Sequence, residues 1–301
     1  MKHIRFYFNS FFYGFFLLYG YSFSLLAEES RVVILSNNNN SAHQQVVSEF
    51  KTSLAQKLPD TKILSDTGVN ASPTPKLVLA LGRKALDLAK LRFPQTPLLA
   101  CLAWDNNFFK HNTNTTGIVL QHTIKQQFKW HKRILPHIKR IGILYSPKHN
   151  KDWVKRAKTE AKRQGLKLIA IAVNSGQELP ASLNAIKRQA GSIMAITDPV
   201  VYSRKTAKAV LLFSFRNRLP FIGLSETWAK SGALYALDWD YAALGTQCAK
   251  MAGRILTGTK IQQVAPQKPD NSLYIINMKT VKHMKLSIKQ KYIDNAARIF
   301  K

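Results

Sequence analysis

The segment Arg140-Ile-Gly-Ile-Leu-Tyr-Ser-Pro147 decides the fold class, because it is an apolar run that ends in a Ser-Pro pair typical of a helix start. An amphipathic stretch at 151–164 follows it, and a second apolar run lies at 166–173. A buried strand, a helix and another buried strand in this order are typical of a parallel sheet covered by helices. The segment therefore predicts an α/β protein.

The same alternation continues on both sides of this segment. Strands are predicted at 31–36, 76–81, 97–103, 140–146, 166–173, 192–197, 220–224 and 232–237. Helices are predicted at 41–58, 83–92, 123–135, 151–164, 179–189, 200–217 and 241–256. The elements form two blocks, one before about residue 121 and one after about residue 139, and this division indicates two α/β lobes instead of one large sheet.

Length and composition agree with a folded protein that buries a sizeable core. The chain has 301 residues, of which 46% are hydrophobic and 20% are charged, and it shows no internal repeat. These values exclude a disordered chain, a collagen-like fibre and a solenoid. The 45 Lys and Arg residues outnumber the 16 Asp and Glu residues, and the formal net charge of +29 raises the question of an anionic partner.

The N-terminal segment is typical of a secretory signal. Lys2, His3 and Arg5 precede the apolar stretch 11–26, and the small residue Ala27 follows it. This stretch is shorter than the roughly 18 apolar residues that a membrane-spanning helix needs. We therefore predict a signal peptide at 1–27 and a periplasmic protein, with an uncleaved N-terminal anchor as the alternative. Export separates the protein from genomic DNA, so no nucleic-acid partner is expected.

The two cysteines, Cys101 and Cys248, lie far apart in the sequence, and both fall in apolar segments. Their spacing does not match a structural zinc site, which uses closely spaced ligands. In an oxidising compartment they are able to form one disulfide, and two buried thiols are the alternative.

Polar residues directly follow most of the predicted strands. Ligands of parallel α/β sheets bind beyond the carboxyl ends of the strands, so these residues form the candidate binding site. We predict ligand contacts from Ser36, Asn37, Gly82, Arg83, Trp104, Asp105, Ser146, Asp198, Ser225, Glu226 and Asp240. No metal ion or cofactor is expected.

Arg83 and Asp198 carry the most specific hypothesis. Arg83 opens a predicted helix, where its guanidinium and the free N–H groups of the helix suit a carboxylate, and the charge of Asp198 suits an ammonium group. The alternatives are an arginine on a solvated helix face and, at Asp198 and Ser146, a helix cap before the following proline. Trp104 either stacks on the ligand or fills the space between the lobes.

Motifs of the common enzyme classes are missing from the sequence. It contains no G-x-S-x-G, H-E-x-x-H, G-x-x-x-x-G-K or G-x-G-x-x-G pattern. The histidines, among them His43, His122 and His131, are scattered without the pairing of metal ligands and are interpreted as surface residues. We therefore expect a binding protein and not an enzyme, with a nucleophile assembled from distant residues as the remaining alternative.

Several motifs between residue 140 and the C-terminus occur in the order and spacing of one protein family. They are Arg140-Ile-Gly-Ile-Leu-Tyr-Ser-Pro147, Ser192-Ile-Met-Ala-Ile-Thr-Asp-Pro199, Leu219-Pro-Phe-Ile-Gly-Leu-Ser225 and Asp240-Tyr-Ala-Ala-Leu-Gly245. A weaker match in the first half of the chain is Leu81-Gly-Arg-Lys-Ala85. With these motifs the chain resembles the periplasmic substrate-binding proteins of ABC importers, in the branch that includes aromatic amino-acid binders.

The resemblance implies a type I binding-protein fold, in which two Rossmann-like lobes with parallel central sheets are joined by a multi-strand hinge and close on a ligand. It places residues 28–120 and 239–270 in the N-terminal lobe, and residues 121–238 and 271–301 in the C-terminal lobe. The chain departs from the family in three loops: Arg83 and Lys84 replace small residues, Trp104-Asp105-Asn106 replaces a small residue and an Asp-Pro pair, and Asn37 to Asn40 form an atypical first loop. Together these departures leave the ligand class open and allow a more anionic or a smaller ligand.

The resemblance also implies what the protein does. It predicts a monomer that captures a small, amino-acid-like solute and delivers it to an ABC permease with its ATPase. The alternative is a protein that senses the solute and signals to a sensor or an envelope complex. Both functions require two lobes that close on the solute. A permease gene and an ATPase gene beside the gene of this protein would favour import.

The basic stretch 123–140 illustrates the excess of positive charge. Its apolar side, which includes Ile124, Phe128 and Ile134, is expected to cover a sheet, while its lysines and arginines face outward. These charges form a solvated surface, or else they attract an anionic envelope surface or acidic partner loops. Membrane insertion is not expected, because the apolar side is needed for the core.

Overall fold

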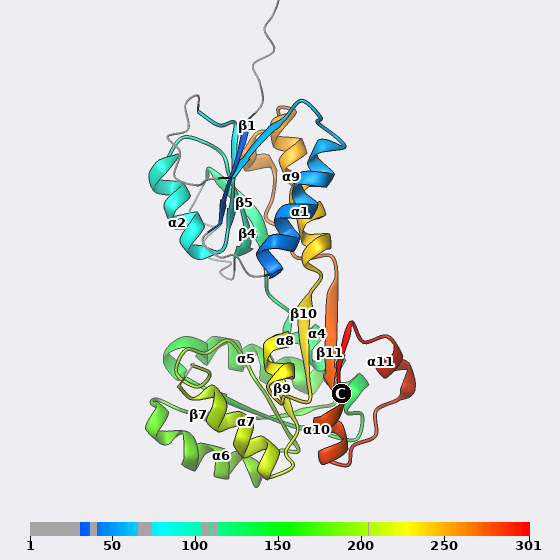
Figure 1. Ribbon diagram of the computed structural model, residues 1–301. Helices are drawn as coiled ribbons and strands as arrows, with labels where there is room; N and C mark the ends of the chain where they lie inside the picture. Colours follow the sequence, from blue (N-terminus) through cyan, green and yellow to red (C-terminus); the bar gives the residue numbers. More distant parts are fainter. Residues whose placement is uncertain (1–30, 37–40, 66–73, 104–108, 110–112, 204) are drawn as a thin grey trace, which may run out of the picture.

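The computed structural model describes residues 31–36, 41–65, 74–103, 109, 113–203 and 205–301. Figure 1 shows two α/β lobes, and the blue and cyan segments lie in the upper, N-terminal one. The predicted α/β fold class is thereby confirmed. The predicted signal peptide lies outside the described residues, as do Asn37, Trp104 and Asp105. No helix within the described ranges is both long enough and apolar enough to cross a membrane.

The N-terminal lobe is built on a parallel five-stranded sheet with the strand order β2-β1-β3-β4-β5. Its strands are β1 (Arg31–Ser36), β2 (Lys62–Ser65), β3 (Leu77–Leu81), β4 (Leu98–Ala103) and β5 (Thr115–Val119). β3 and β5 are buried at every position, as expected for strands with helices over both faces of the sheet.

Alternate residues of β1 pack against helices on opposite faces of this sheet. Val32 and Ile34 join the core beneath α1 (Ser41–Ala55) and α9 (Tyr241–Leu256). Val33 and Leu35 pack instead with the buried residues of α2 (Arg83–Arg92). α9 lies along α1 although most of the second lobe separates the two helices in sequence. The N-terminal lobe is therefore completed by a segment from far downstream.

The C-terminal lobe contains a seven-stranded sheet with the order β12-β11-β10-β9-β8-β6-β7. Its strands are β6 (Arg140–Tyr145), β7 (Lys167–Ala172), β8 (Ser192–Met194), β9 (Phe221–Gly223), β10 (Tyr235–Trp239), β11 (Ser272–Asn277) and β12 (Arg298–Phe300). All neighbouring strands are parallel except β10 and β11. This pair is antiparallel because the chain leaves the lobe through β10 and returns to it through β11.

Helices on both faces of the second sheet enclose the larger core. They are α4 (Ile124–Ile134), α5 (Pro147–Arg163), α6 (Leu179–Lys187), α7 (Ala207–Arg216), α8 (Glu226–Lys230), α10 (Met278–His283) and α11 (Gln290–Asp294), with short 3-10 turns at Gly176–Glu178 and Ile261–Gln263. Phe128 and Ile134 of α4 are buried in this core, so the apolar side of the helix covers the sheet as predicted. A capping box between Thr123 and Gln126 starts α4.

Three stretches of chain connect the lobes. The first runs from β5 of the N-terminal sheet to α4, and the second runs from β10 of the C-terminal sheet to α9. The third leads from Gln267, which pairs with Ile118 at the end of β5, back to β11. The exact residues at which each lobe begins and ends stay a prediction from the sequence.

Several predicted elements differ from the structure. α1 and β8 each end three residues earlier than predicted, and α5 begins at Pro147, four residues earlier. Two further differences have a local cause. The helix predicted at 200–217 begins only at Ala207, because the preceding residues form turns in which the Thr206 hydroxyl donates to the Val201 carbonyl at 2.7 Å. The strand predicted at 232–237 is shifted to β10, because a turn follows α8 and the Ala233 N–H donates to the Trp228 carbonyl at 2.9 Å. The sequence pattern also does not predict the strands β2, β5, β11 and β12 or the helices α8, α10 and α11.

Cys101 of β4 and Cys248 of α9 meet in the core of the N-terminal lobe. Both are fully buried thiols, and their Sγ atoms lie 2.6 Å apart. Burial raises the pKa of the Cys248 thiol, so it stays protonated at neutral pH. The fold thus brings together two cysteines that are distant in sequence, as the disulfide alternative requires, and it buries both, as the alternative of two buried thiols requires.

Gly245 sets the close approach of α9 to α1. A Cβ atom at this position would lie 2.6 Å from the carbonyl oxygen of Val46 and 3.0 Å from the backbone nitrogen of Phe50. Gly253, on the same helix, has no atom within 4 Å of the corresponding position. The glycine at 245 is therefore required for packing between the two helices.

Candidate functional site

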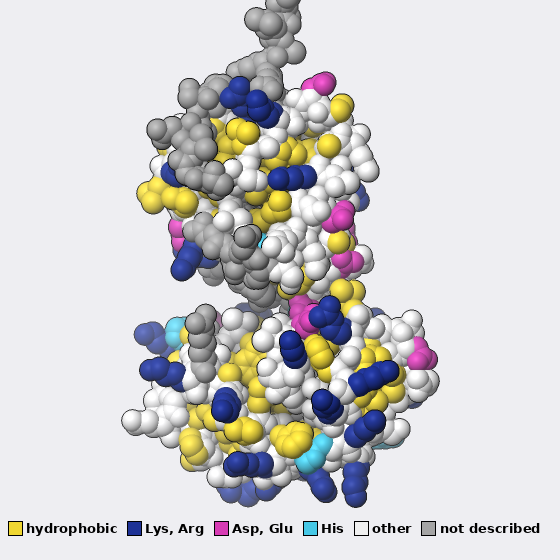
Figure 2. Space-filling view, in the orientation of Figure 1, with side chains coloured by type: hydrophobic (Ala, Val, Ile, Leu, Met, Phe, Trp, Pro, Cys, Tyr) yellow, Lys and Arg dark blue, Asp and Glu magenta, His cyan; other side chains and the backbone are white. Residues whose placement is uncertain are grey.

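The carboxyl ends of the strands in both lobes lie on the side of the connecting stretches. In the N-terminal lobe β5 leads into the first connection, so its parallel neighbours β4, β3 and β1 end on the same side. In the C-terminal lobe β10 leads into the second connection, and its parallel neighbours β9, β8 and β6 also end there. The predicted strand-end residues therefore occupy the facing edges of two sheets. Figure 2 shows the molecule narrowing between these edges.

In the N-terminal lobe, the ends of β1 and β3 share one neighbour, His43 of α1. The Ser36 hydroxyl lies 2.9 Å from His43 Nδ1, and a Cβ atom at Gly82 would lie 3.8 Å from the same ring. Gly82 has a φ of +82°, a conformation that glycine adopts without strain. Partial burial lowers the pKa of His43, which favours the neutral ring. Sequence reasoning interpreted His43 as a surface residue, because its position between two strand ends is visible only in three dimensions.

Arg83 is the first residue of α2 and stands at the facing edge, as predicted. Its Nε donates to both carboxylate oxygens of Asp87, one turn further along the helix, at 2.9 and 3.0 Å. The Arg83 side chain is 63% exposed, so solvent screens this ion pair. An incoming carboxylate would compete with Asp87 for the guanidinium.

Asp198 is buried at the end of the loop that follows β8, and its carboxylate is fully used by the protein. One oxygen accepts from the backbone N–H of Ser146 at 2.6 Å and from the Asn150 amide at 2.8 Å. The other accepts from the backbone N–H groups of Val200 and Val201, both at 3.0 Å. Asp198 thus fastens the loop after β8 to the start of α5. Its charge is already compensated without an ammonium group.

A second carboxylate organises the strand ends nearer to the hinge. Asp238 accepts from the Glu226 N–H at 2.7 Å, from the Trp239 N–H at 2.9 Å and from the Tyr241 hydroxyl at 2.8 Å. Burial and the adjacent Asp238 charge raise the pKa of Tyr241, so its hydroxyl remains a donor. The Glu226 carboxylate itself forms an ion pair with Arg298 of β12.

The remaining predicted contacts are mainly helix-cap positions in the structure. Asp240 caps α9, where its carboxylate accepts from the Ala243 N–H at 3.0 Å. Ser146 precedes α5, and Ser225 precedes α8. The arrangement brings the described residues of the prediction to one facing pair of sheet edges, whereas the ligand contacts themselves stay predictions.

The three connecting stretches meet in one small cluster, to which each contributes one residue. The His122 ring stacks on Trp239, with ring centroids 3.6 Å apart and planes inclined by 11°, and the Ser272 hydroxyl lies 3.4 Å from His122 Nδ1. Burial lowers the pKa of His122 to about 4, so the ring is neutral at pH 7. Sequence reasoning missed this hinge cluster, because its members are far apart in the chain.

The chemistry of these groups suits a small polar solute. The described part of the chain holds no group of three His, Cys, Asp or Glu side chains that could bind a metal ion. The buried carboxylates of Asp198 and Asp238 hold loops in place and already accept from the backbone N–H groups of Ser146 and Glu226. The Ser36 hydroxyl and the exposed Arg83 guanidinium stand at the facing edge of the N-terminal lobe. Such a set offers hydrogen bonds and one positive charge to a ligand.

The chain is similar to known proteins in sequence and in fold. The family model of the ABC transporter substrate binding proteins matches residues 101–299. No curated protein sequence matches the chain. A Streptococcus pneumoniae domain in complex with L-Trp is 18% identical, with coverage of 90% of this chain and 100% of that one and a TM-score of 0.64.

Two further solved structures share the fold. A ligand-free, open substrate-binding protein with adhesive properties from Clostridium difficile is 18% identical, covers 90% of this chain and 99% of that one, and has a TM-score of 0.75. A branched-chain amino-acid transporter substrate-binding protein from Streptococcus pneumoniae, in complex with isoleucine, is 11% identical, with coverages of 79% and 87% and a TM-score of 0.51. Because the family model matches more than half of the chain, the protein belongs to the ABC transporter substrate-binding proteins, which bind solutes and are not enzymes.

Proposed function

We propose that the protein is exported to the periplasm, captures a small amino-acid-like solute between its two lobes and delivers it to an ABC permease with its ATPase. The observation that carries this proposal is the arrangement of polar strand ends on two facing sheet edges. Three connecting stretches join these edges within the described residues, so a ligand that contacts both edges is able to draw the lobes together. Family membership supports the role in transport.

The solute class is inferred from the groups at the facing edges. Arg83 offers a guanidinium at the start of a helix, which suits a carboxylate, and the loops around Ser146 and Ser225 offer hydroxyl and backbone groups. Asp198 contributes indirectly in this proposal, because it fixes the loop and its charge is already met by four donors. The amino-acid ligands of two proteins with the same fold, L-Trp and isoleucine, support the same class.

The closing motion has to pass through the hinge cluster of His122, Trp239 and Ser272. The stacked contact between His122 and Trp239 joins the first connecting stretch to the second, and no ion pair is involved. A neutral stacked pair is able to slide without separating opposite charges. The cluster therefore permits a change in the angle between the lobes while it keeps the three stretches together.

A binding screen tests the proposal. The protein is heated with each of the common amino acids at about 1 mM, because a ligand that binds only the folded state raises the melting temperature. We expect at least one amino acid to raise it clearly. Stabilisation by none of the amino acids, together with stabilisation by a sugar or a nucleobase, would contradict the proposed solute class.

Two variants on one helix test the role of Arg83. Arg83→Ala should weaken binding of the stabilising amino acid by about 30-fold, equivalent to about 2 kcal/mol, if the guanidinium meets the ligand carboxylate. Asp87→Ala removes the competing carboxylate and should leave affinity unchanged or increase it. Isothermal titration of both variants distinguishes these outcomes. Equal affinity for Arg83→Ala and the parent would show that Arg83 only lies on a solvated surface.

A further inference from the structure

Positive charge is concentrated in one of the two lobes. Over the predicted boundaries, the N-terminal lobe has 14 Lys and Arg against 9 Asp and Glu, a formal charge of +5. The C-terminal lobe has 29 against 7, a formal charge of +22. Figure 2 shows Lys and Arg side chains spread over the visible face of the lower, C-terminal lobe, with few acidic ones between them. Since both lobes share one fold, the fold does not explain this difference.

Helix α5 carries the most ordered part of this charge. Five lysines recur along it with alternating spacings of three and four residues, which places them along one side of a helix. This lysine stripe consists of Lys148, Lys151, Lys155, Lys158 and Lys162, and all five are exposed. At a rise of about 1.5 Å per residue, the stripe extends over about 20 Å. It begins at the end of β6, at the facing edge of the sheet, and runs away from it.

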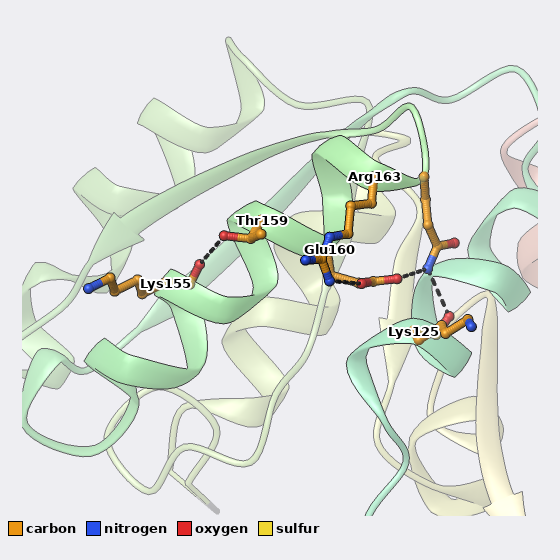
Figure 3. Close-up of polar contacts among 6 residues, drawn as sticks. Lys125, Lys155, Thr159, Glu160 and Arg163 are labelled. Atoms are coloured by element: carbon orange, nitrogen blue, oxygen red, sulfur yellow. Dashed lines mark hydrogen bonds and ion pairs between the residues drawn. The ribbon is translucent and has the colours of Figure 1, made fainter.

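α5 has two acidic residues, Asp152 and Glu160. Asp152 is exposed and lies four residues from Lys148 and three from Lys155, so it offsets part of the charge of the stripe, although it forms no ion pair with a described lysine. Glu160 accepts a hydrogen bond from Gln164 at 2.8 Å and lies 3.8 Å from Arg163, and Gln164 also donates to the Lys125 carbonyl of α4. Figure 3 shows Glu160 on the side of α5 that faces α4, whereas Lys155 points away from it. Within the described part of the chain, no ion pair involves any of the five lysines.

The stripe is not required for packing and opposes helix stability. The core side of α5 is formed by Asn150, Val154, Ala157 and Ala161. Like charges three or four residues apart on a helix repel one another, and lysines near the helix N-terminus are unfavourable because the helix dipole is positive there. The first turn contains no acidic residue that would compensate. A feature that conflicts with local stability in this way indicates a role outside the fold.

We propose that the lysine stripe docks the C-terminal lobe onto the surface of an anionic phospholipid membrane. Lysines attract the acidic lipid headgroups without inserting, and each one near such a surface adds to the binding. A straight row of charges, within a lobe that is positive overall, matches an extended anionic plane better than a compact acidic peptide. Single-stranded nucleic acid is usually held by aromatic side chains as well as by charges, whereas Trp153, the tryptophan of α5, packs against the core.

Vesicle sedimentation tests the proposal. The processed protein is mixed with vesicles that contain about 30% phosphatidylglycerol in phosphatidylcholine, or phosphatidylcholine alone, at about 50 and 500 mM salt. All samples use the same processed form, because the apolar stretch 11–26 would itself enter a bilayer. We expect at least tenfold stronger partition onto the anionic vesicles at low salt, and loss of this preference at high salt.

A charge-matched pair of variants assigns the binding to the stripe. The first variant changes the five stripe lysines to Gln, and the control changes Lys279, Lys282, Lys285, Lys289 and Lys291, five exposed lysines of the same lobe, to Gln. The stripe variant should lose at least tenfold in partition, and the control should remain within about threefold of the parent. Circular dichroism and amino-acid binding should be unchanged in both variants, which separates this proposal from solute binding.

Three results would overturn the proposal. Equal losses in the two variants would show that total charge acts and the stripe does not. Equal partition of the parent onto anionic and neutral vesicles would exclude recognition of acidic lipid. Binding of the parent to an acidic polypeptide or to RNA, without binding to the anionic vesicles, would assign the stripe to a macromolecule instead of a membrane.

Discussion

The two lobes have the same architecture but differ in how they are completed and in what they present to solvent. Each core is completed by a segment that arrives after the chain has passed through the other lobe. In the C-terminal core this segment begins with β11 and adds strands to the sheet, whereas in the N-terminal core it is mainly the helix α9, which packs along α1. The N-terminal lobe has a formal charge of +5 and the C-terminal lobe one of +22. The comparison shows that two lobes with the same architecture can differ in which chain segments complete their cores and in the charge on their surfaces.

The largest effect is expected where α9 completes the N-terminal lobe. Gly245→Ala should reduce the free energy of unfolding by about 3 kcal/mol, because the new Cβ would press on the backbone of α1. Gly253→Ala on the same helix meets no atom within 4 Å and should be neutral or stabilising by up to about 1 kcal/mol. Urea unfolding followed by circular dichroism measures both. Equal stability of the two variants would show that α9 does not complete the lobe through close packing.

Low pH should reduce the free energy of unfolding because two buried histidines take up protons. One of them, His131, lies in the C-terminal lobe, and the other, His122, lies in the hinge cluster. Burial lowers the pKa of His131 to about 4, assisted by the charge of Lys139, and burial lowers that of His122 to about 4. The unfolded state takes up these protons near pH 6.5 and the folded state only near pH 4, so stability is complete above about pH 6.5 and falls between these values.

The expected slope in that window is at most about 1.4 kcal/mol per pH unit for each histidine. In His131→Gln the slope of the free energy of unfolding against pH should fall, because one fewer proton is taken up on unfolding. The variant also loses the contact between His131 and the Ser192 hydroxyl at 2.9 Å, so its stability is lower at every pH. Urea midpoints between pH 7.5 and 5 measure the slope. An unchanged slope in the variant would mean that His131 does not stay neutral in the folded protein.

The smallest effect concerns the charge on α5. Lys148→Glu should raise the free energy of unfolding by about 0.3 kcal/mol, because the negative charge at the positive end of the helix and the lost repulsion with Lys151 outweigh the new repulsion with Asp152. Lys162→Glu lies in the last turn, where the dipole favours positive charge, and should give no gain. Thermal melts at low salt compare the two. Equal shifts would show that position along the helix dipole is unimportant here.

Local pattern was sufficient to predict many elements of the core, although not the buried strands β5 and β11. Continuous apolar runs predict β1, β3 and β6 within one residue, because both faces of these strands are buried. β2 and β12 escape prediction, because they are short edge strands without a buried residue and their sequences carry no continuous apolar signal. The turns before α7 escape it because they depend on side-chain hydrogen bonds from Asp198 and Thr206.

The candidate site was only partly predictable for a related reason. The rule that ligands bind at the carboxyl ends of parallel strands correctly predicted that Arg83 and Asp198 lie at the facing edges of the two sheets. The donors that compensate Asp198 come from Ser146 and Asn150, distant in sequence, so its bonding could not be inferred from the chain. The hinge cluster around His122 likewise forms only when three separate stretches meet.

The central claim is that a solute bound between the facing edges closes the two lobes. Small-angle X-ray scattering with and without a saturating concentration of the amino acid that most raises the melting temperature tests it directly. The account predicts a smaller radius of gyration in the bound state. The pair-distance distribution should also shift to shorter distances, because the two lobes move closer together. An unchanged radius of gyration at proven saturation would contradict it.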